Sequence, residues 1–278
     1  MLALHVVVGR EALAEGIEIT GAQVAELLRD GKQSVTTSGP SPGEFVEFYR
    51  DVATRRGVDH VVSVHLSGRI SRTLESAHLA AAAVRADINV TVIDSRTLGL
   101  AMGYAVCSGA ALASTGSTAP DVAAHIRERV AECSAYFYVD TLEFLRRGGR
   151  IGAASALLGG ALAIKPLLTV ADGEVKPWER VRTRAKAMAR LKAQTLADVE
   201  SHRHAGRAVS VAIHHCDAAE KAAAFADQIR AAVGADAPEV RVDVVELGAV
   251  TAVHTGPGTM AVVIAPGDLS TPVEGGPT

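Results

Sequence analysis

The first half of the chain alternates between short apolar runs and longer stretches with helical periodicity. The run at 58–66 predicts a strand, the alanine-rich stretch at 73–84 predicts a helix, and 89–93 predicts a second strand. Helical patterns follow at 103–114 and 121–132. Because a strand–helix series of this kind folds into a parallel sheet with helices on both faces, we expect α/β structure here.

The second half holds more strands in a different order. Residues 171–174, Ala-Asp-Gly-Glu, predict a turn that joins two strands as a hairpin. Longer helices are expected at 183–202 and 218–233. The predicted strands of this half are 136–139, 164–170, 175–178, 209–214 and 240–246. This order is typical of α+β structure.

Together these patterns predict an α/β protein of two domains. A parallel-sheet, Rossmann-like domain is expected over 1–135, and an α+β domain with a largely antiparallel or mixed sheet over 136–265. The last stretch, 266–278, is rich in glycine, proline and serine and is expected to be disordered.

Composition narrows the classes of protein that fit. The chain has 278 residues, 48% of them hydrophobic, and a net charge of −3, which suits a soluble globular protein. No run of about 18 uncharged apolar residues is present to insert into a membrane, and residues 1–8 form a strand pattern instead of a signal peptide. Mixed charges argue against nucleic-acid binding. The widely spaced Cys107, Cys133 and Cys216 indicate neither disulfides nor a zinc site, which favours the cytoplasm.

Segment 140–151 places three arginines beside two glycines. Arg146, Arg147 and Arg150 surround Gly148 and Gly149, whose backbone permits a close approach. One interpretation is a helix end with basic residues near its last carbonyls. The other is a cationic wall of an apolar site, which suits Arg150 best because it follows the glycines.

Three further segments carry polar residues between turn-formers. Apart from any ligand role, stretch 36–42 is either a loop of turn-formers or the cap of a following helix, and Ser41 is expected to cap that helix with Pro42 at its first position. Ser67 ends a strand, where it either caps the next turn or meets an anion. The basic run 180–186 predicts the exposed face of a helix, with one inward arginine as the alternative.

Seven motifs in order give the chain a resemblance to the DegV family. They are Thr36-Thr-Ser-Gly-Pro-Ser-Pro42, Val64-His-Leu-Ser67, Val92-Ile-Asp-Ser95, 142–151, Ile164-Lys-Pro166, Val181-Arg-Thr183 and His254-Thr-Gly-Pro-Gly258. The resemblance implies a carrier that binds a long-chain fatty acid, such as palmitate or oleate, in a tunnel between two domains. It also implies that the carrier presents the acid to a separate fatty acid kinase, is itself no enzyme, and needs no metal or other cofactor.

The resemblance also assigns roles to individual residues. Thr37 and Ser67 match the positions that hydrogen-bond the fatty acid carboxyl, with His254 and Arg150 nearby. We expect His254 to lie in a loop, since Gly256 and Gly258 follow it. Arg182, together with Arg150, matches positions that face the kinase.

Departures from the family pattern concern one turn and the start of the chain. Arg69 and Arg72 stand where the family has small residues, and they either strengthen carboxylate binding or face the kinase. Family members begin with one more strand, so we expect the true start to lie upstream of Met1 or the chain to be a short form. Acyl length would depend on tunnel residues that we expect to include Leu157, Leu158, Leu162 and Ile164.

Two other functions compete with the carrier. Ser67, His254 and an acid such as Asp94 could form the nucleophile system of a hydrolase or acyltransferase, although no Gly-x-Ser-x-Gly elbow is present. A lipid sensor without a kinase partner would share the same tunnel, so only a kinase partner would distinguish it from a carrier. The sequence contains no phosphate-binding Gly-x-x-x-x-Gly-Lys-Ser/Thr loop, so it does not indicate that the protein is itself a kinase.

Overall fold

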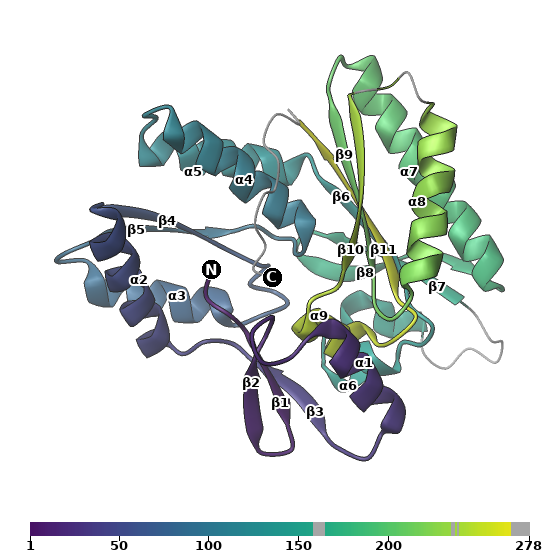
Figure 1. Ribbon diagram of the computed structural model, residues 1–278, viewed down its shortest axis with the longest axis horizontal. Coiled ribbons are helices and arrows are strands. Elements are labelled where there is room, and N and C mark those ends of the chain that lie inside the picture. The colour runs from purple at the N-terminus through teal and green to yellow at the C-terminus, as the bar shows by residue number, and fades with distance from the viewer. Residues whose placement is uncertain (158–164, 235–236, 238, 268–278) are drawn as a thin grey trace. The chain divides into compact units, whose positions relative to one another are not determined.

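In the computed structural model, which describes residues 1–157, 165–234, 237 and 239–267, the strands form three sheets (Figure 1). Contacts divide the described chain into a first unit, residues 1–2 and 39–132, and a second unit, residues 3–38 and 133–267. The segment 3–38, expected in the N-terminal domain, thus groups with the second unit. Apart from that difference, the predicted domain ranges stay a prediction.

The first unit is built on the parallel pair of strands β4 (His60–His65) and β5 (Asn89–Asp94). Its helices are α2 (Pro42–Arg56), α3 (Thr73–Val84), α4 (Leu100–Ser114) and α5 (Ala119–Ala131). Alternate strand residues point to opposite faces, so Val92 packs with α2 and α3 while Ile93 packs with α4 and α5. Both faces are therefore covered, which confirms the predicted parallel sheet.

The start of α2 follows from its sequence. The Ser41 side chain accepts a hydrogen bond from the Glu44 amide at 3.3 Å, and Glu44 Oε2 accepts one from the Ser41 amide at 2.8 Å. This reciprocal capping box stands directly before Pro42, whose ring suits the first helical position. The predicted structural role of Ser41 is confirmed.

A six-stranded mixed sheet forms the centre of the second unit. Its order is β10-β9-β11-β6-β7-β8, and only β10 and β9 pair in parallel. The strands are β6 (Ser134–Tyr138), β7 (Lys165–Ala171), β8 (Glu174–Val181), β9 (Val209–His215), β10 (Val240–Glu246) and β11 (Met260–Pro266). Sequence patterns missed β11. The hairpin of β7 and β8 is confirmed, with positive φ at Asp172 and Gly173 as tight hairpin turns require.

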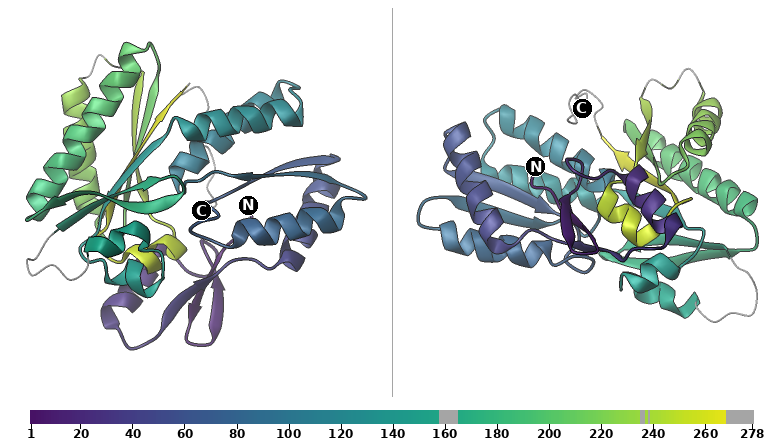
Figure 2. Two further views of the ribbon diagram at one scale, coloured as in Figure 1. Left: turned by 180° about the vertical axis from the view of Figure 1, so that it is seen from behind. Right: turned by 60° about the horizontal axis from the view of Figure 1, so that its bottom comes forward.

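Helices cover both faces of this sheet. Helices α7 (Arg184–His204) and α8 (Ala219–Val233) lie on one face, where they enclose Ile213 and Met260 (Figures 1 and 2). On the other face, Phe137 packs beneath α6 and the short helix η1. These helices are α6 (Glu143–Arg147) and η1 (Gly152–Leu157). The mixed α/β architecture predicted for the chain is confirmed.

The second unit also holds a three-stranded antiparallel sheet with the order β2-β1-β3. Its strands are β1 (His5–Val8), β2 (Glu11–Ala14) and β3 (Val35–Ser38), and the helices on it are α1 (Gly21–Asp30) and α9 (Ala249–Thr255). Val6, Val24 and Ala252 form part of their common core. Stretch 36–42 therefore begins as a strand and not a loop, because Thr36 and Thr37 pair with β1.

Three predictions lie wholly or partly outside the described residues. They concern the tunnel residues Leu158, Leu162 and Ile164, the first residue of the strand expected at 164–170, and the tail from 268 onward. Pro266, expected in that tail, ends β11. None of the helices in the described residues combines the length and the apolar character that crossing a membrane requires.

Candidate ligand-binding site

A pocket of about 310 Å³ lies within the second unit. The end of α1 and strand β3 form one wall, α6 and the loop after it form another, and α9 closes the third. Its polar lining includes Thr37, Arg147, Arg150 and His254. The structure therefore brings three of the predicted site residues, Thr37, Arg150 and His254, to one cavity.

A hydrogen bond joins two of these residues across 217 positions of sequence: Thr37 Oγ1 lies 2.8 Å from His254 Nε2. His254 belongs to the last turn of α9, which corrects the expectation that it lies in a loop. The two glycines that suggested a loop follow the helix end, where Gly256 adopts a φ of 78°. Thr37 is held by the pairing of β3 with β1, opposite Val6.

The imidazole of His254 is neutral at neutral pH. Burial lowers its pKa to about 4, and the positive charge of Arg150 acts in the same direction. Its Nδ1 is buried without a hydrogen-bond partner in the described part of the chain. Because a buried N–H without an acceptor is costly, we assign the proton to Nε2, which then donates to Thr37 Oγ1. The Thr37 hydroxyl can in turn donate its own proton to a ligand.

Arg150 reaches the pocket from the loop that follows α6. Its Nη1 donates a hydrogen bond to the carbonyl oxygen of Gly148 at 2.5 Å, and its side chain is half-buried. Gly149, with a φ of 70°, turns the chain just before it. An arginine held in this way places a permanent positive charge beside Thr37 and His254.

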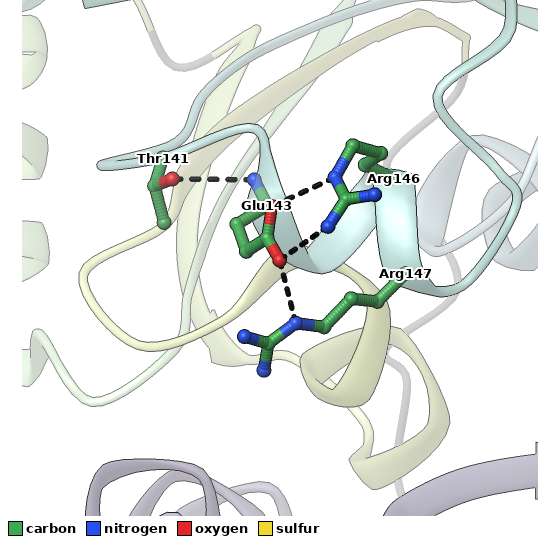
Figure 3. A network of polar contacts seen from close by, with 4 residues as sticks. All are labelled: Thr141, Glu143, Arg146 and Arg147. Atoms are coloured by element: carbon green, nitrogen blue, oxygen red, sulfur yellow. Dashed lines mark hydrogen bonds and ion pairs between the residues drawn. The ribbon is translucent and has the colours of Figure 1, made fainter.

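Arg146 and Arg147 make a different set of contacts (Figure 3). Glu143 Oε1 accepts hydrogen bonds from Arg146 Nη2 and Arg147 Nε, each at 2.7 Å, and Glu143 Oε2 accepts one from Arg146 Nε at 2.8 Å. These hydrogen bonds hold the pKa of Glu143 at about 2. Arg146 and Arg147 thus lie in the last turn of α6, as the helix-end interpretation placed them, but these hydrogen bonds go to the Glu143 carboxylate, and Arg147 also borders the pocket.

Ser67 belongs to the first unit, where it shapes a turn. Its buried Oγ accepts a hydrogen bond from the Arg69 amide at 3.2 Å. Asp94 Oδ1 accepts further hydrogen bonds, from the Gly68 amide at 3.2 Å and the Arg96 amide at 2.8 Å. Ser67 therefore stabilises this turn, and its contact with a ligand stays a prediction. Arg69 is exposed on the same turn.

The basic run 180–186 begins in β8 and enters α7, so it is only partly helical. Arg182 is exposed between the two elements. The inward residue is Arg184, whose Nη2 donates to the Gly258 carbonyl at 3.3 Å and whose Nη1 lies 3.5 Å from Asp140 Oδ2. Sequence reasoning had left open which arginine points inward.

His214 and His215 end β9, and both are buried. Burial lowers the pKa of His214 to about 4, so it is neutral at neutral pH. Throughout the described ranges, no three His, Cys, Asp or Glu side chains gather in a way that could hold a metal ion.

Comparisons with known proteins agree with this architecture. A model of the family described as "Uncharacterised protein, DegV family" matches residues 1–267. A DegV domain-containing protein of Streptomyces coelicolor is 43% identical over 94% of this chain and 89% of its own length.

Two solved structures are similar in fold and sequence. One is DegV of Bacillus subtilis, described as a fatty acid binding protein, with a TM-score of 0.85 and 32% identity over 95% of this chain and 90% of that one. The other is a DegV family protein of Thermus thermophilus, described by its fatty acid binding. It has a TM-score of 0.82 and 34% identity over 95% of this chain and 91% of that one. On these matches, the chain belongs to the DegV family.

Proposed function

We propose that this protein binds a long-chain fatty acid and holds its carboxyl group at Thr37, with His254 and Arg150 beside it. The observation that carries the proposal is the hydrogen bond between Thr37 and His254 in a pocket that Arg150 also lines. The fatty acid binding described for the two solved relatives supports the same ligand class. A role of Ser67 as a second hydroxyl ligand rests on the family motif alone.

The chemistry of the pocket suits a carboxylate. Burying this anion is costly unless donors and a positive charge meet it. In the proposed arrangement, His254 donates to Thr37 and Thr37 donates to a carboxylate oxygen, while Arg150 supplies the charge. Transfer of about fourteen methylenes from water provides on the order of 11 kcal/mol before ordering costs, so the acyl chain supplies most of the affinity.

We further propose that the protein is a carrier and not the catalyst. A serine hydrolase would need a carboxylate on His254 Nδ1 to orient the ring, and within the described residues this atom has no hydrogen-bond partner. A separate fatty acid kinase would then phosphorylate the bound acid, with the exposed Arg182 and with Arg150 facing it. Because such a kinase uses ATP, the proposal places the protein in the cytoplasm.

Native mass spectrometry of protein purified from a bacterial host tests the binding proposal. We expect a mass excess of roughly 250–285 Da that corresponds to one bound ligand per protein, which is the mass of a fatty acid with about fourteen methylenes or slightly more. Organic extraction should identify the ligand as a C16 or C18 acid. A mass without ligand, together with no uptake of added palmitate or oleate, would refute it.

A pair of threonine variants tests the site. Thr37→Val removes the hydroxyl and keeps the shape, so we expect palmitate affinity to fall by at least about tenfold, because hydrogen bonds to charged groups are strong. Thr169→Val is the matched control, since its hydroxyl also makes one hydrogen bond, to the Ala135 carbonyl at 2.8 Å, away from the pocket. Equal affinities of the two variants would contradict the assignment of Thr37.

The carrier role needs its own experiment. Loaded protein is mixed with a fatty acid kinase and ATP, and acyl phosphate is trapped with hydroxylamine as the hydroxamate. We expect product with the wild type and much less with Arg182→Ala at unchanged palmitate affinity. Absence of product with the wild type would leave a lipid sensor as the function.

A further inference from the structure

The short helix that carries His254 is capped by a residue from a distant part of the chain. Glu15 follows strand β2, and its Oε1 accepts a hydrogen bond from the Val250 amide at 2.8 Å. Val250 is the second residue of α9, and Gly248 at the cap position has no side chain that could accept this bond. The first amides of any helix lack partners within the helix, so Glu15 satisfies one of them.

The fit between Glu15 and the start of α9 is close. A β-carbon at Gly248 would lie 2.5 Å from Glu15 Oε1 and 3.2 Å from its Cδ, so only glycine leaves room for the carboxylate. Burial raises the pKa of Glu15, and the hydrogen bond from Val250 opposes that rise. A negative charge at this end of the helix also interacts favourably with the helix dipole.

The same small sheet holds both ends of α9. The backbone amide of Glu15 donates to the Leu4 carbonyl at 2.8 Å, next to the start of β1. Strand β1 pairs with β3, which carries Thr37, and Thr37 holds His254 in the last turn of α9. Glu15 and Thr37 thus tie the two ends of one seven-residue helix to one sheet.

We propose that Glu15 is a positioning residue for the fatty acid site: by fixing the first turn of α9 to the β1–β3 sheet, it keeps His254 Nε2 in line with Thr37 Oγ1. This inference rests on the proposed function. It adds a residue that is not part of the lining of the pocket. No motif of the sequence pointed to it, because Glu15 and Val250 are 235 positions apart.

Three variants separate positioning from a general effect on the turn. Glu15→Met removes the acceptor at similar length, and Glu15→Gln keeps an acceptor without the charge. Glu18→Ala is the matched control, because Glu18 Oε2 accepts from the Ala14 amide at 2.8 Å and so stabilises the same turn from within. Palmitate affinity is measured by calorimetry, and the titration of the His254 ring is followed by NMR.

We expect Glu15→Met to weaken palmitate binding about tenfold, the equivalent of 1.4 kcal/mol. The pKa of His254 should rise from about 4 towards its ordinary value, because a loosened α9 admits water to the ring. Glu15→Gln should restore both properties to within about threefold of wild-type affinity, and Glu18→Ala should change neither. Wild-type behaviour of Glu15→Met, or an equal loss in Glu18→Ala, would overturn the proposal.

The proposal can still be tested if Glu15→Met does not fold or if the wild type binds no fatty acid. If Glu15→Met does not fold, Gly248→Ala replaces it. The backbone of Gly248 is extended, with a φ of −57° and a ψ of 155° that alanine also adopts, so the effect of the added methyl group is to displace the Glu15 carboxylate. The same rise in the His254 pKa is expected, and an unchanged titration overturns the proposal. If the wild type binds no fatty acid, the proposed function fails, and the His254 titration alone then tests the positioning role.

Discussion

Gly148→Ala should disturb the proposed site through a single methyl group. Gly148 has a helical φ of −71°, which alanine adopts without strain. Its new β-carbon would lie 2.8 Å from His254 Cε1 and 3.3 Å from Cγ, and closer still to Nδ1. Ordinary contact begins near 3.4 Å, so the ring must move by about 1 Å, which breaks a hydrogen bond of 2.8 Å to Thr37.

The change in the free energy of unfolding caused by Gly148→Ala follows from two opposing effects. Overpacking and the lost hydrogen bond destabilise the folded protein by about 1–4 kcal/mol, and replacing glycine in a helical conformation returns about 0.4–1 kcal/mol. We expect a net loss of about 1–3 kcal/mol in urea unfolding. Palmitate affinity should fall roughly tenfold or more, because Thr37 loses its partner.

The neighbouring glycine provides the control. Gly149 has a φ of 70°, and a β-carbon added there would have no atom within 4 Å, so Gly149→Ala adds backbone strain without touching His254. We expect it to cost about 1–2 kcal/mol of stability and to leave the NMR signal of the His254 ring unchanged. The reasoning is refuted if Gly148→Ala keeps wild-type affinity and an unshifted His254 signal.

Two other predictions concern pH and Arg184. Burial lowers the pKa of His65, His214 and His254 to about 4, so the unfolded chain binds more protons than the folded chain between pH 6.5 and 4. Stability should therefore be highest above pH 6.5 and fall as the pH drops through this window, by about 2 kcal/mol per histidine at pH 5. A urea midpoint that stays constant from pH 7.5 to 5 would contradict this. Arg184→Met should lower the free energy of unfolding by about 1–2 kcal/mol, because it removes the donor to a loop carbonyl. Arg190→Met, which removes an exposed arginine over an aromatic ring, should cost less than about 1 kcal/mol in the same assay, and the reverse order would refute the assignment.

Local signals in the sequence predicted much of the fold. Helix α3 spans 73–84 as its periodicity indicated. The cap of α2 at Ser41 could be predicted because the capping box consists of residues within four consecutive positions. The turn at Asp172 and Gly173 was equally readable, since both positions suit positive φ. In each case the residues that decide the structure are neighbours in sequence.

The remaining elements depend on distant partners. Strand β3 has four residues and α9 has seven, so neither shows enough periods to be recognised. Gly256 and Gly258 suggested a loop, yet each leaves room for another part of the chain, Phe144 and Asp140 respectively. The pairing of Thr37 with His254 could not be derived from spacing at all, and only the family resemblance placed them together.

The shortness of α9 couples the pocket to the folded state as a whole. Isolated helices of fewer than about 12 residues do not persist in water, so α9 depends on the sheet and the helices around it. A nascent or partly unfolded chain would therefore lack the His254 wall and have no measurable affinity for the proposed ligand. Any ligand that binds only the folded chain shifts the folding equilibrium by RT ln(1 + [L]/Kd), so saturation with the proposed fatty acid would lower the unfolded fraction that proteases attack.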